Sequence, residues 1–285
     1  MNENEPINVM HVSSKEDDDP IMQYRSVETR NLKRVEVGGI EFYHATGQEL
    51  IALVLERIEE IRSQKVKSGV QHILPLDPFR YARVTGSKKF LPLARQSFIN
   101  LPAASGMLWM SRMVRKELPE TVTTINLTMN LIRLAQAKEY TVFIVGGTDT
   151  VLEKLFFNLK RSFPRLRIVG RHSGYFGEGG EERVVEALKK TDPHMIILGL
   201  GFEKELKWLL KHRDTLGNTV LINVGGSLDI MAGKKKKAPD SLQVRGYTWL
   251  WRALNRPHRW YRLFIIFGWW LRVVYWRLFK KDDKS

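Results

Sequence analysis

Residues 141–147 read Thr-Val-Phe-Ile-Val-Gly-Gly, a run of apolar β-formers that ends in two glycines. A short continuous apolar run bounded by a turn signal is typical of a strand buried on both faces. Helical apolar spacing follows over Thr150–Phe163. This stretch therefore predicts a buried strand that leads directly into a helix, the repeating unit of an α/β fold.

The same unit recurs towards the C-terminus. His194–Leu198 predicts a strand that ends in Gly199-Leu200-Gly201, and Thr219–Val224 predicts one that ends in Gly225-Gly226. The other elements expected in this half are a helix over Thr128–Ala137, a strand over Leu166–Gly170 and helices over Glu181–Lys190 and Lys204–His212. Alternating strands and helices with short connections predict a mainly parallel sheet covered by helices on both faces.

The N-terminal half is predicted to add further elements to the same domain. A hairpin is expected where Gly38-Gly39 separates two short β-forming runs, at Arg34–Val37 and Ile40–Tyr43. The remaining expected elements are a helix over Gln48–Val66, a strand over Val70–Leu76, an interrupted helix over Pro78–Ala94, a strand over Phe98–Leu101 and a helix over Leu108–Leu118.

The composition is that of a folded protein with a strong basic excess. The 285 residues are 43% hydrophobic and 27% charged, the formal net charge is +15, and cysteine is absent. The absence of cysteine excludes a disulfide scaffold, thiol catalysis and a cysteine-ligated zinc site.

The charge divides the chain into three parts. Residues 1–20 carry one Lys and six acidic side chains, whereas residues 233–285 carry fourteen Lys and Arg against three Asp. We therefore expect a disordered acidic tail over 1–33, an α/β domain over 34–232 and a basic appendage over 233–285. The acidic start has no basic region followed by an apolar stretch, so we expect no secretory signal and a cytosolic protein.

The appendage is also rich in tryptophan, because six of the eight Trp residues follow residue 245. Arginines are interleaved with them, and residues 263–271 form an apolar run between two of these arginines. As a helix this run would be about 14 Å long, too short to cross a bilayer. Trp and Arg at headgroup level predict an interfacial anchor on anionic lipid in preference to a spanning helix, a core helix or a nucleic-acid patch. The cations expected to contact the membrane are Arg252, Arg256, Arg259 and Arg262.

The glycines that end three predicted strands indicate a ligand crevice, since ligands of parallel sheets bind beyond the carboxyl ends of the strands. Glycine there lets backbone N–H groups approach a phosphate, although tight turns alone would also explain it. Neither a dinucleotide-binding G-x-G-x-x-G nor a Walker A loop is present. The candidate nucleotide- and sugar-binding glycines are Gly146, Gly147, Gly201, Gly225 and Gly226.

An ordered series of short segments over about residues 34–262 resembles the WecG/TagA/CpsF family of bacterial glycosyltransferases. The series comprises Val37-Gly38-Gly39-Ile40, Val142–Gly147, Gly170–Phe176, Leu198–Gly201, Val224–Asp229, Ala232–Pro239, Arg245–Leu250 and Arg256-Pro257. The resemblance implies a Rossmann-like fold and an enzyme at the cytoplasmic face of the membrane. Such an enzyme transfers an N-acetylmannosamine-type or related sugar from a UDP donor to a polyprenyl-diphosphate-linked acceptor, without a further cofactor.

The sequence departs from the family pattern at the positions expected to carry chemistry. The family's Leu-Pro-Asp-Gly segment reads Leu-Pro-Ala-Ala here, so that Ala103 stands in place of the proposed catalytic Asp. The Asn of a Thr-x-Asn segment is Asp77, and the Gln of a Lys-Gln-Glu segment is Glu205. Two interpretations stay open. Either Asp77 or Glu205 supplies the missing carboxylate, or the chain is a catalytically silent homologue that binds nucleotide or lipid carrier and supports an active partner.

Several other positions have both a functional and a structural interpretation. His172 contacts phosphate, acts as an acid or is structural. Asp229 either binds ribose or the sugar, or caps a helix. Lys235, Lys237 and Arg245 are expected to meet the acceptor diphosphate or the membrane. The scattered histidines predict no metal site, and we expect no nucleic-acid partner. Self-association and contacts with other proteins of polysaccharide synthesis stay open.

Overall fold

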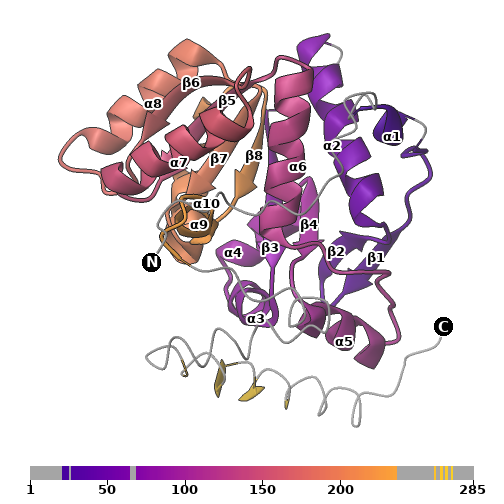
Figure 1. Ribbon diagram of the computed structural model, residues 1–285. Helices are drawn as coiled ribbons and strands as arrows, with labels where there is room; N and C mark the ends of the chain where they lie inside the picture. The colour runs from indigo at the N-terminus through magenta and orange to yellow at the C-terminus, as the bar shows by residue number, and fades with distance from the viewer. Residues whose placement is uncertain are drawn as a thin grey trace, which may run out of the picture.

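The computed structural model describes residues 21–25, 27–64 and 69–235, together with the single positions 260, 264, 265, 267, 268 and 271. The predicted α/β class is confirmed, because six parallel strands form one sheet in the order β4-β3-β8-β7-β5-β6 (Figure 1). The strands are β3 (Val70–Leu76), β4 (Ile99–Pro102), β5 (Thr141–Gly146), β6 (Arg167–His172), β7 (Met195–Gly199) and β8 (Thr219–Asn223). Residues 1–20 and almost all of the predicted appendage lie outside the described residues.

Helices cover both faces of the sheet, as the sequence predicts. One core contains the apolar sides of α2 (Gly47–Arg62), α6 (Thr124–Ala137), α7 (Asp149–Ser162) and α10 (Ser227–Met231). The other contains those of α3 (Pro78–Thr85), α4 (Phe90–Arg95), α5 (Ser105–Met113), α8 (Gly180–Thr191) and α9 (Phe202–His212). Successive residues of a central strand join opposite cores: Val142 and Ile144 face the first core, and Phe143 and Val145 face the second.

The hairpin predicted around Gly38-Gly39 is confirmed as β1 (Arg34–Val37) and β2 (Ile40–Tyr43). Both glycines have positive φ, 54° and 84°, as a two-residue turn between twisted strands requires. The short helix α1 (Met22–Arg25) precedes the hairpin, and Ile21 and Tyr24 are buried in the first core. The folded domain therefore includes residues before 34, the position at which the charge pattern predicted that it would begin.

The interrupted helix predicted over 78–94 is confirmed as two helices, α3 and α4, because Gly86 ends the first. The helix expected over 108–118 begins at Ser105 and ends at Met113. It ends early because Arg115 adopts φ 55°, and the Lys116 amide closes the turn by donating to the Ser111 carbonyl at 2.8 Å.

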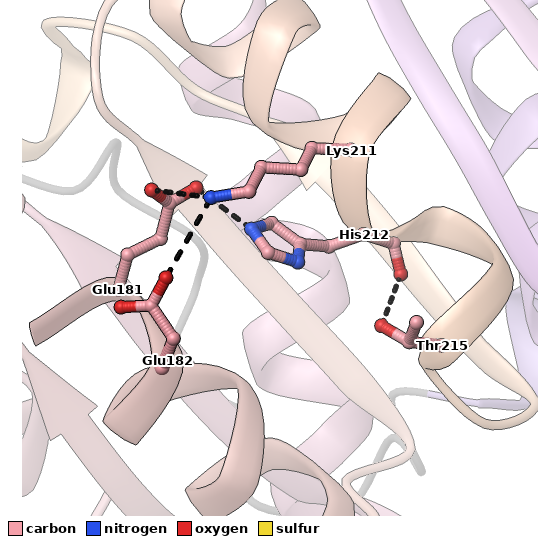
Figure 2. A network of polar contacts seen from close by, with 5 residues as sticks. All are labelled: Glu181, Glu182, Lys211, His212 and Thr215. Carbon is pink, nitrogen blue, oxygen red and sulfur yellow. Dashed lines mark hydrogen bonds and ion pairs between the residues drawn. The ribbon is translucent and has the colours of Figure 1, made fainter. Parts of the chain in front are cut away.

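A polar network joins α8 to the end of α9 on the surface (Figure 2). Glu181 accepts from Lys211 Nζ at 3.2 Å and lies 2.7 Å from His212 Nε2, and Glu182 lies 3.7 Å from the same Lys211. Burial raises the pKa of the Glu181 carboxyl, but the hydrogen bonds with His212 and Lys211 outweigh it and leave that pKa below its ordinary value. The 3-10 turn η1 (Arg213–Thr215) follows, and the Thr215 hydroxyl donates to the His212 carbonyl.

Candidate functional site

The sheet brings the sequence-predicted positions to one edge. Because all six strands are parallel, their carboxyl ends lie at the same edge, where open α/β sheets bind ligands. Along this edge the chain presents Ala103 after β4, Asp77 after β3, Gly225 after β8, Gly201 after β7, Gly147 after β5 and His172 at the end of β6.

The turns after β5, β6 and β7 interlock through glycine. The Gly147 amide donates to the Gly199 carbonyl at 3.3 Å, and the Gly174 amide donates to the Gly147 carbonyl at 2.9 Å. Gly146 has φ 137°, and a Cβ built there would lie 2.3 Å from the Gly199 oxygen. Gly146 is thus required by the close approach of the Gly199 backbone in the neighbouring turn.

Glu205 occupies the place where a phosphate was expected. Its Oε1 accepts from the Gly225 amide at 2.8 Å and from the Gly201 amide at 3.2 Å, so both donors are used within the protein. The Glu205 side chain is 0% exposed, and its Oε2 has no hydrogen-bond partner. Burial raises the pKa of this carboxyl to about 7, although Arg80 and the neighbouring amides act in the opposite direction. Glu205 therefore ties the turns after β7 and β8 together.

Arg80 is a cation at this edge that the sequence analysis did not single out. Its Nη1 donates to the Pro75 carbonyl at 3.1 Å, its Nε lies 3.8 Å from Asp77 Oδ2, and its guanidinium lies over the Phe202 ring at 5.4 Å. A Cβ on Gly225 would lie 2.8 Å from Arg80 Nη2, so the guanidinium lies directly against the turn after β8. The side chain is 18% exposed. Arg80 thus places a positive charge between the ends of β3 and β8.

Asp77 has the capping role that the Asp-Pro sequence allows. Its Oδ1 accepts from the Arg80 amide at 2.9 Å, and Pro78 fills the first position of α3. The side chain keeps 19% exposure. Ala103 lies beside it, because the Ala103 amide donates to the Leu76 carbonyl at 2.9 Å. Asp77 is therefore a partly exposed carboxylate beside Ala103.

The remaining candidates are held by local partners. Asp229, in the first turn of α10, forms an ion pair with Lys235. His172 Nδ1 lies 2.8 Å from the Ser173 carbonyl, and its ring lies 5.9 Å from that of Phe176. Gly226 follows Gly225 with ordinary φ of −77° and space around it. The candidates Lys237, Arg245, Arg252, Arg256, Arg259 and Arg262 lie outside the described residues.

Within the described part of the chain, no group of three or more His, Asp or Glu side chains could hold a metal ion. No helix there has the length and apolar character needed to cross a bilayer.

Comparison with known proteins identifies the family of the chain. Two similar proteins of Staphylococcus aureus, from strains NCTC 8325 / PS 47 and MRSA252, are 27% and 26% identical to the chain over 229 residues. Each alignment covers 80% of this chain and 87% of the relative, and both relatives are named N-acetylglucosaminyldiphosphoundecaprenol N-acetyl-beta-D-mannosaminyltransferase. The family model described as "Glycosyl transferase WecG/TagA/CpsF family" matches residues 35–283, which include every strand of the sheet and all six turns at its carboxyl edge. The chain belongs to the WecG/TagA/CpsF family of glycosyl transferases.

Proposed function

We propose that the protein transfers an N-acetylmannosamine-like or other hexose from a UDP-sugar to a polyprenyl-diphosphate-linked acceptor in the synthesis of a cell-surface polysaccharide. The observation that carries this proposal is the family match over residues 35–283, which spans the whole carboxyl edge. The names of the two relatives support the sugar and the lipid-linked acceptor.

The reaction needs positive charge where the donor diphosphate leaves. The bond between the anomeric carbon and the phosphate oxygen breaks, a bond to the acceptor hydroxyl forms, and UDP departs with the negative charge. Arg80 is the cation that we assign to this charge, and Lys235, which forms an ion pair with Asp229, is kept as a residue proposed to meet the acceptor diphosphate or the membrane. Arg80 is suited to the role because its guanidinium is held in place by Pro75 and Phe202 and is still partly exposed.

The acceptor hydroxyl must lose its proton, and we assign the base to Asp77. Its carboxylate is partly exposed at the end of β3, beside Ala103. Glu205 has a pKa better matched to a base, but its side chain is 0% exposed and one of its oxygens is bonded to two amides. We therefore assign Glu205 a positioning role: it holds the turns after β7 and β8 in register.

The proposed location is the cytoplasmic face of the membrane, where a lipid-linked acceptor presents its diphosphate. The basic, Trp-rich sequence of residues 233–285 supports peripheral attachment to anionic lipid. We keep Lys237, Arg245 and the four arginines from Arg252 to Arg262 as the residues proposed to contact lipid or acceptor.

The direct test is transfer of labelled sugar to a lipid-linked acceptor. The full chain is incubated with UDP-N-acetylmannosamine and undecaprenyl-diphosphate-linked N-acetylglucosamine, and labelled lipid product is separated from the water-soluble donor. Formation of labelled lipid supports the proposal. If no UDP-hexose gives product with this acceptor, the proposed activity is refuted.

A second function is favoured by one observation, the alanine at position 103. Both nearby carboxyls have structural partners: Asp77 caps α3, and Glu205 bonds two turns. The second candidate is a catalytically silent homologue that binds the nucleotide or the lipid carrier. Calorimetry with UDP alone separates the cases, since heat of binding without turnover supports this candidate and absence of binding refutes both nucleotide-dependent functions.

A further inference from the structure

We infer that the exposed face of α5 is a second membrane-binding surface, on the α/β domain itself. This face would contact anionic lipid while the carboxyl edge of the sheet binds the lipid-linked acceptor. This inference rests on the proposed function, because only a lipid-linked acceptor requires the edge to face a bilayer. Its occupant is a membrane surface that contains acidic phospholipid.

The first observation is an exposed tryptophan near the carboxyl edge of the sheet. Trp109 on α5 is 65% exposed, although large apolar side chains are costly to leave in water. Buried positions Met107, Met110 and Ser111 hold the opposite side of the helix against the domain. The exposed face is therefore separate from the packed face, as in an amphipathic helix at an interface.

The second observation is the charge that follows this tryptophan. Arg112, Arg115 and Lys116 are all exposed, and Glu117 is the single acidic side chain among residues 105–117. The half-exposed Leu108 and Met113 add apolar surface to the same region. Tryptophan, aliphatic side chains and a basic excess are the combination that suits the headgroup layer of an anionic membrane.

The third observation is that hydrogen bonds fix the backbone of residues 112–116, which carry the basic side chains. Ser111 is 0% exposed, its carbonyl accepts from the Lys116 amide at 2.8 Å, and its hydroxyl accepts from the Leu118 amide at 3.3 Å. The same hydroxyl donates to the Leu108 carbonyl at 2.8 Å. One buried serine thus holds the end of α5 and the residues that follow it.

The fourth observation is the position of α5 relative to the site. α5 begins two residues after Ala103, and a Cβ on Gly106 would lie 2.4 Å from Pro78, which follows Asp77. Figure 1 shows α5 and α3 close to each other at one end of the molecule. A bilayer that contacts α5 would therefore bring an acceptor diphosphate near the carboxyl ends of β3 and β4.

The absence of cysteine from the sequence allows a site-specific test on the full chain. A polarity-sensitive fluorophore is attached to the cysteine of the Arg112→Cys variant on α5. The control is the Lys154→Cys variant, whose label lies at an exposed position of α7; each variant loses one positive charge. Vesicles of phosphatidylcholine with roughly a quarter phosphatidylglycerol are added, and pure phosphatidylcholine vesicles serve as the uncharged control. We expect a blue shift for the label at position 112 with the anionic vesicles and none for the label at 154.

A second pair of variants measures the contribution of the tryptophan. Trp109 and Phe157 are both 65% exposed, but Phe157 lies on α7. We expect Trp109→Ser to weaken vesicle binding on the order of tenfold, and Phe157→Ser to leave it unchanged.

Three results would overturn the inference: no vesicle binding by the full chain, binding without a spectral change at position 112, or a label at 112 already shielded before vesicles are added. The last result would show that a second copy or another segment covers α5. Transfer activity is measured separately. Activity with a label that stays in water refutes the α5 contact alone, and a membrane-embedded label without activity refutes the proposed function alone.

Discussion

Replacing Glu205 by Gln should remove a pH dependence from the stability of the fold. The carboxyl is fully buried, and its pKa is raised from 4.5 to about 7. Between these values the folded chain keeps the proton and the unfolded chain has released it. The free energy of unfolding therefore falls as the pH rises from 4.5 to 7, and the loss is complete above pH 7.

The size of the effect follows from the shift. At about 1.4 kcal/mol for each pKa unit, the carboxyl lowers the free energy of unfolding by roughly 3 kcal/mol between pH 4.5 and pH 8. Glutamine keeps a carbonyl oxygen for the Gly201 and Gly225 amides but has no titrating group. Its amide nitrogen would be buried at the position of Oε2, and that cost does not vary with pH.

Urea unfolding followed by far-UV circular dichroism at steps from pH 5 to pH 8 measures this difference. We expect Glu205→Gln to gain about 2.5 kcal/mol relative to the parent protein between pH 5 and pH 8, because part of the loss in the parent has already occurred at pH 5. Glu203→Gln is the control, because Glu203 is on the same helix with its side chain 43% exposed, and its curve should run parallel to the parent. If the difference between Glu205→Gln and the parent changes by less than about 0.5 kcal/mol, Glu205 does not titrate in the folded state as argued.

Three further predictions concern other residues of the fold and site. Asp77→Asn should lower sugar transfer by ~10²–10⁴-fold with an unchanged melting temperature, because Asn caps a helix as well as Asp but cannot act as a base; full activity would refute that role. Gly146→Ala should cost about 2 kcal/mol or more in urea unfolding, because of its φ of 137° and the backbone oxygen at 2.3 Å, whereas Gly226→Ala should cost little; equal losses would contradict the argument. Glu181→Gln should lower the melting temperature at pH 7 and by less near pH 3, because a carboxyl with a lowered pKa loses its stabilising effect as the pH falls below 4.5 and through its folded pKa. Glu182→Gln is the control, and a deficit in Glu181→Gln that is the same at both pH values would refute the role of the ion pair.

The strands could be predicted from the sequence because each buried strand is a short apolar run that ends at a glycine or proline signal. The run over 141–147 predicted β5 to within one residue. The order of the strands could not be predicted in this way, since β8 lies between β3 and β7 through contacts between residues far apart in the chain. The sequence predicts that the strand ends share an edge, but the order decides that Asp77 and Gly225 are neighbours.

The burial of Glu205 was missed, although the sequence held a signal for it. Its neighbours Lys204 and Lys207 are charged and exposed, a pattern typical of a solvated helix face. Yet Glu205 is spaced three, four and seven residues before Trp208, Leu209 and His212, and all four side chains are buried. The acidic side chain follows the apolar periodicity because two glycine amides are available to bond it.

Arg80 could not be found from sequence spacing, and its position connects the departures from the family pattern. The resemblance implies amides where this chain has Asp77 and Glu205, which would mean that this chain has two more potential negative charges at one edge. Arg80 lies 3.8 Å from the first, and its charge opposes the rise in the pKa of the second. A single arginine therefore compensates both carboxyls, and with Glu205 partly protonated near pH 7 the cluster stays close to neutral. Since both acids lie near the same guanidinium, we expect Asp77 and Glu205 to act as one electrostatic unit, so that replacing either by its amide would change the charge available to the donor diphosphate proposed to bind there.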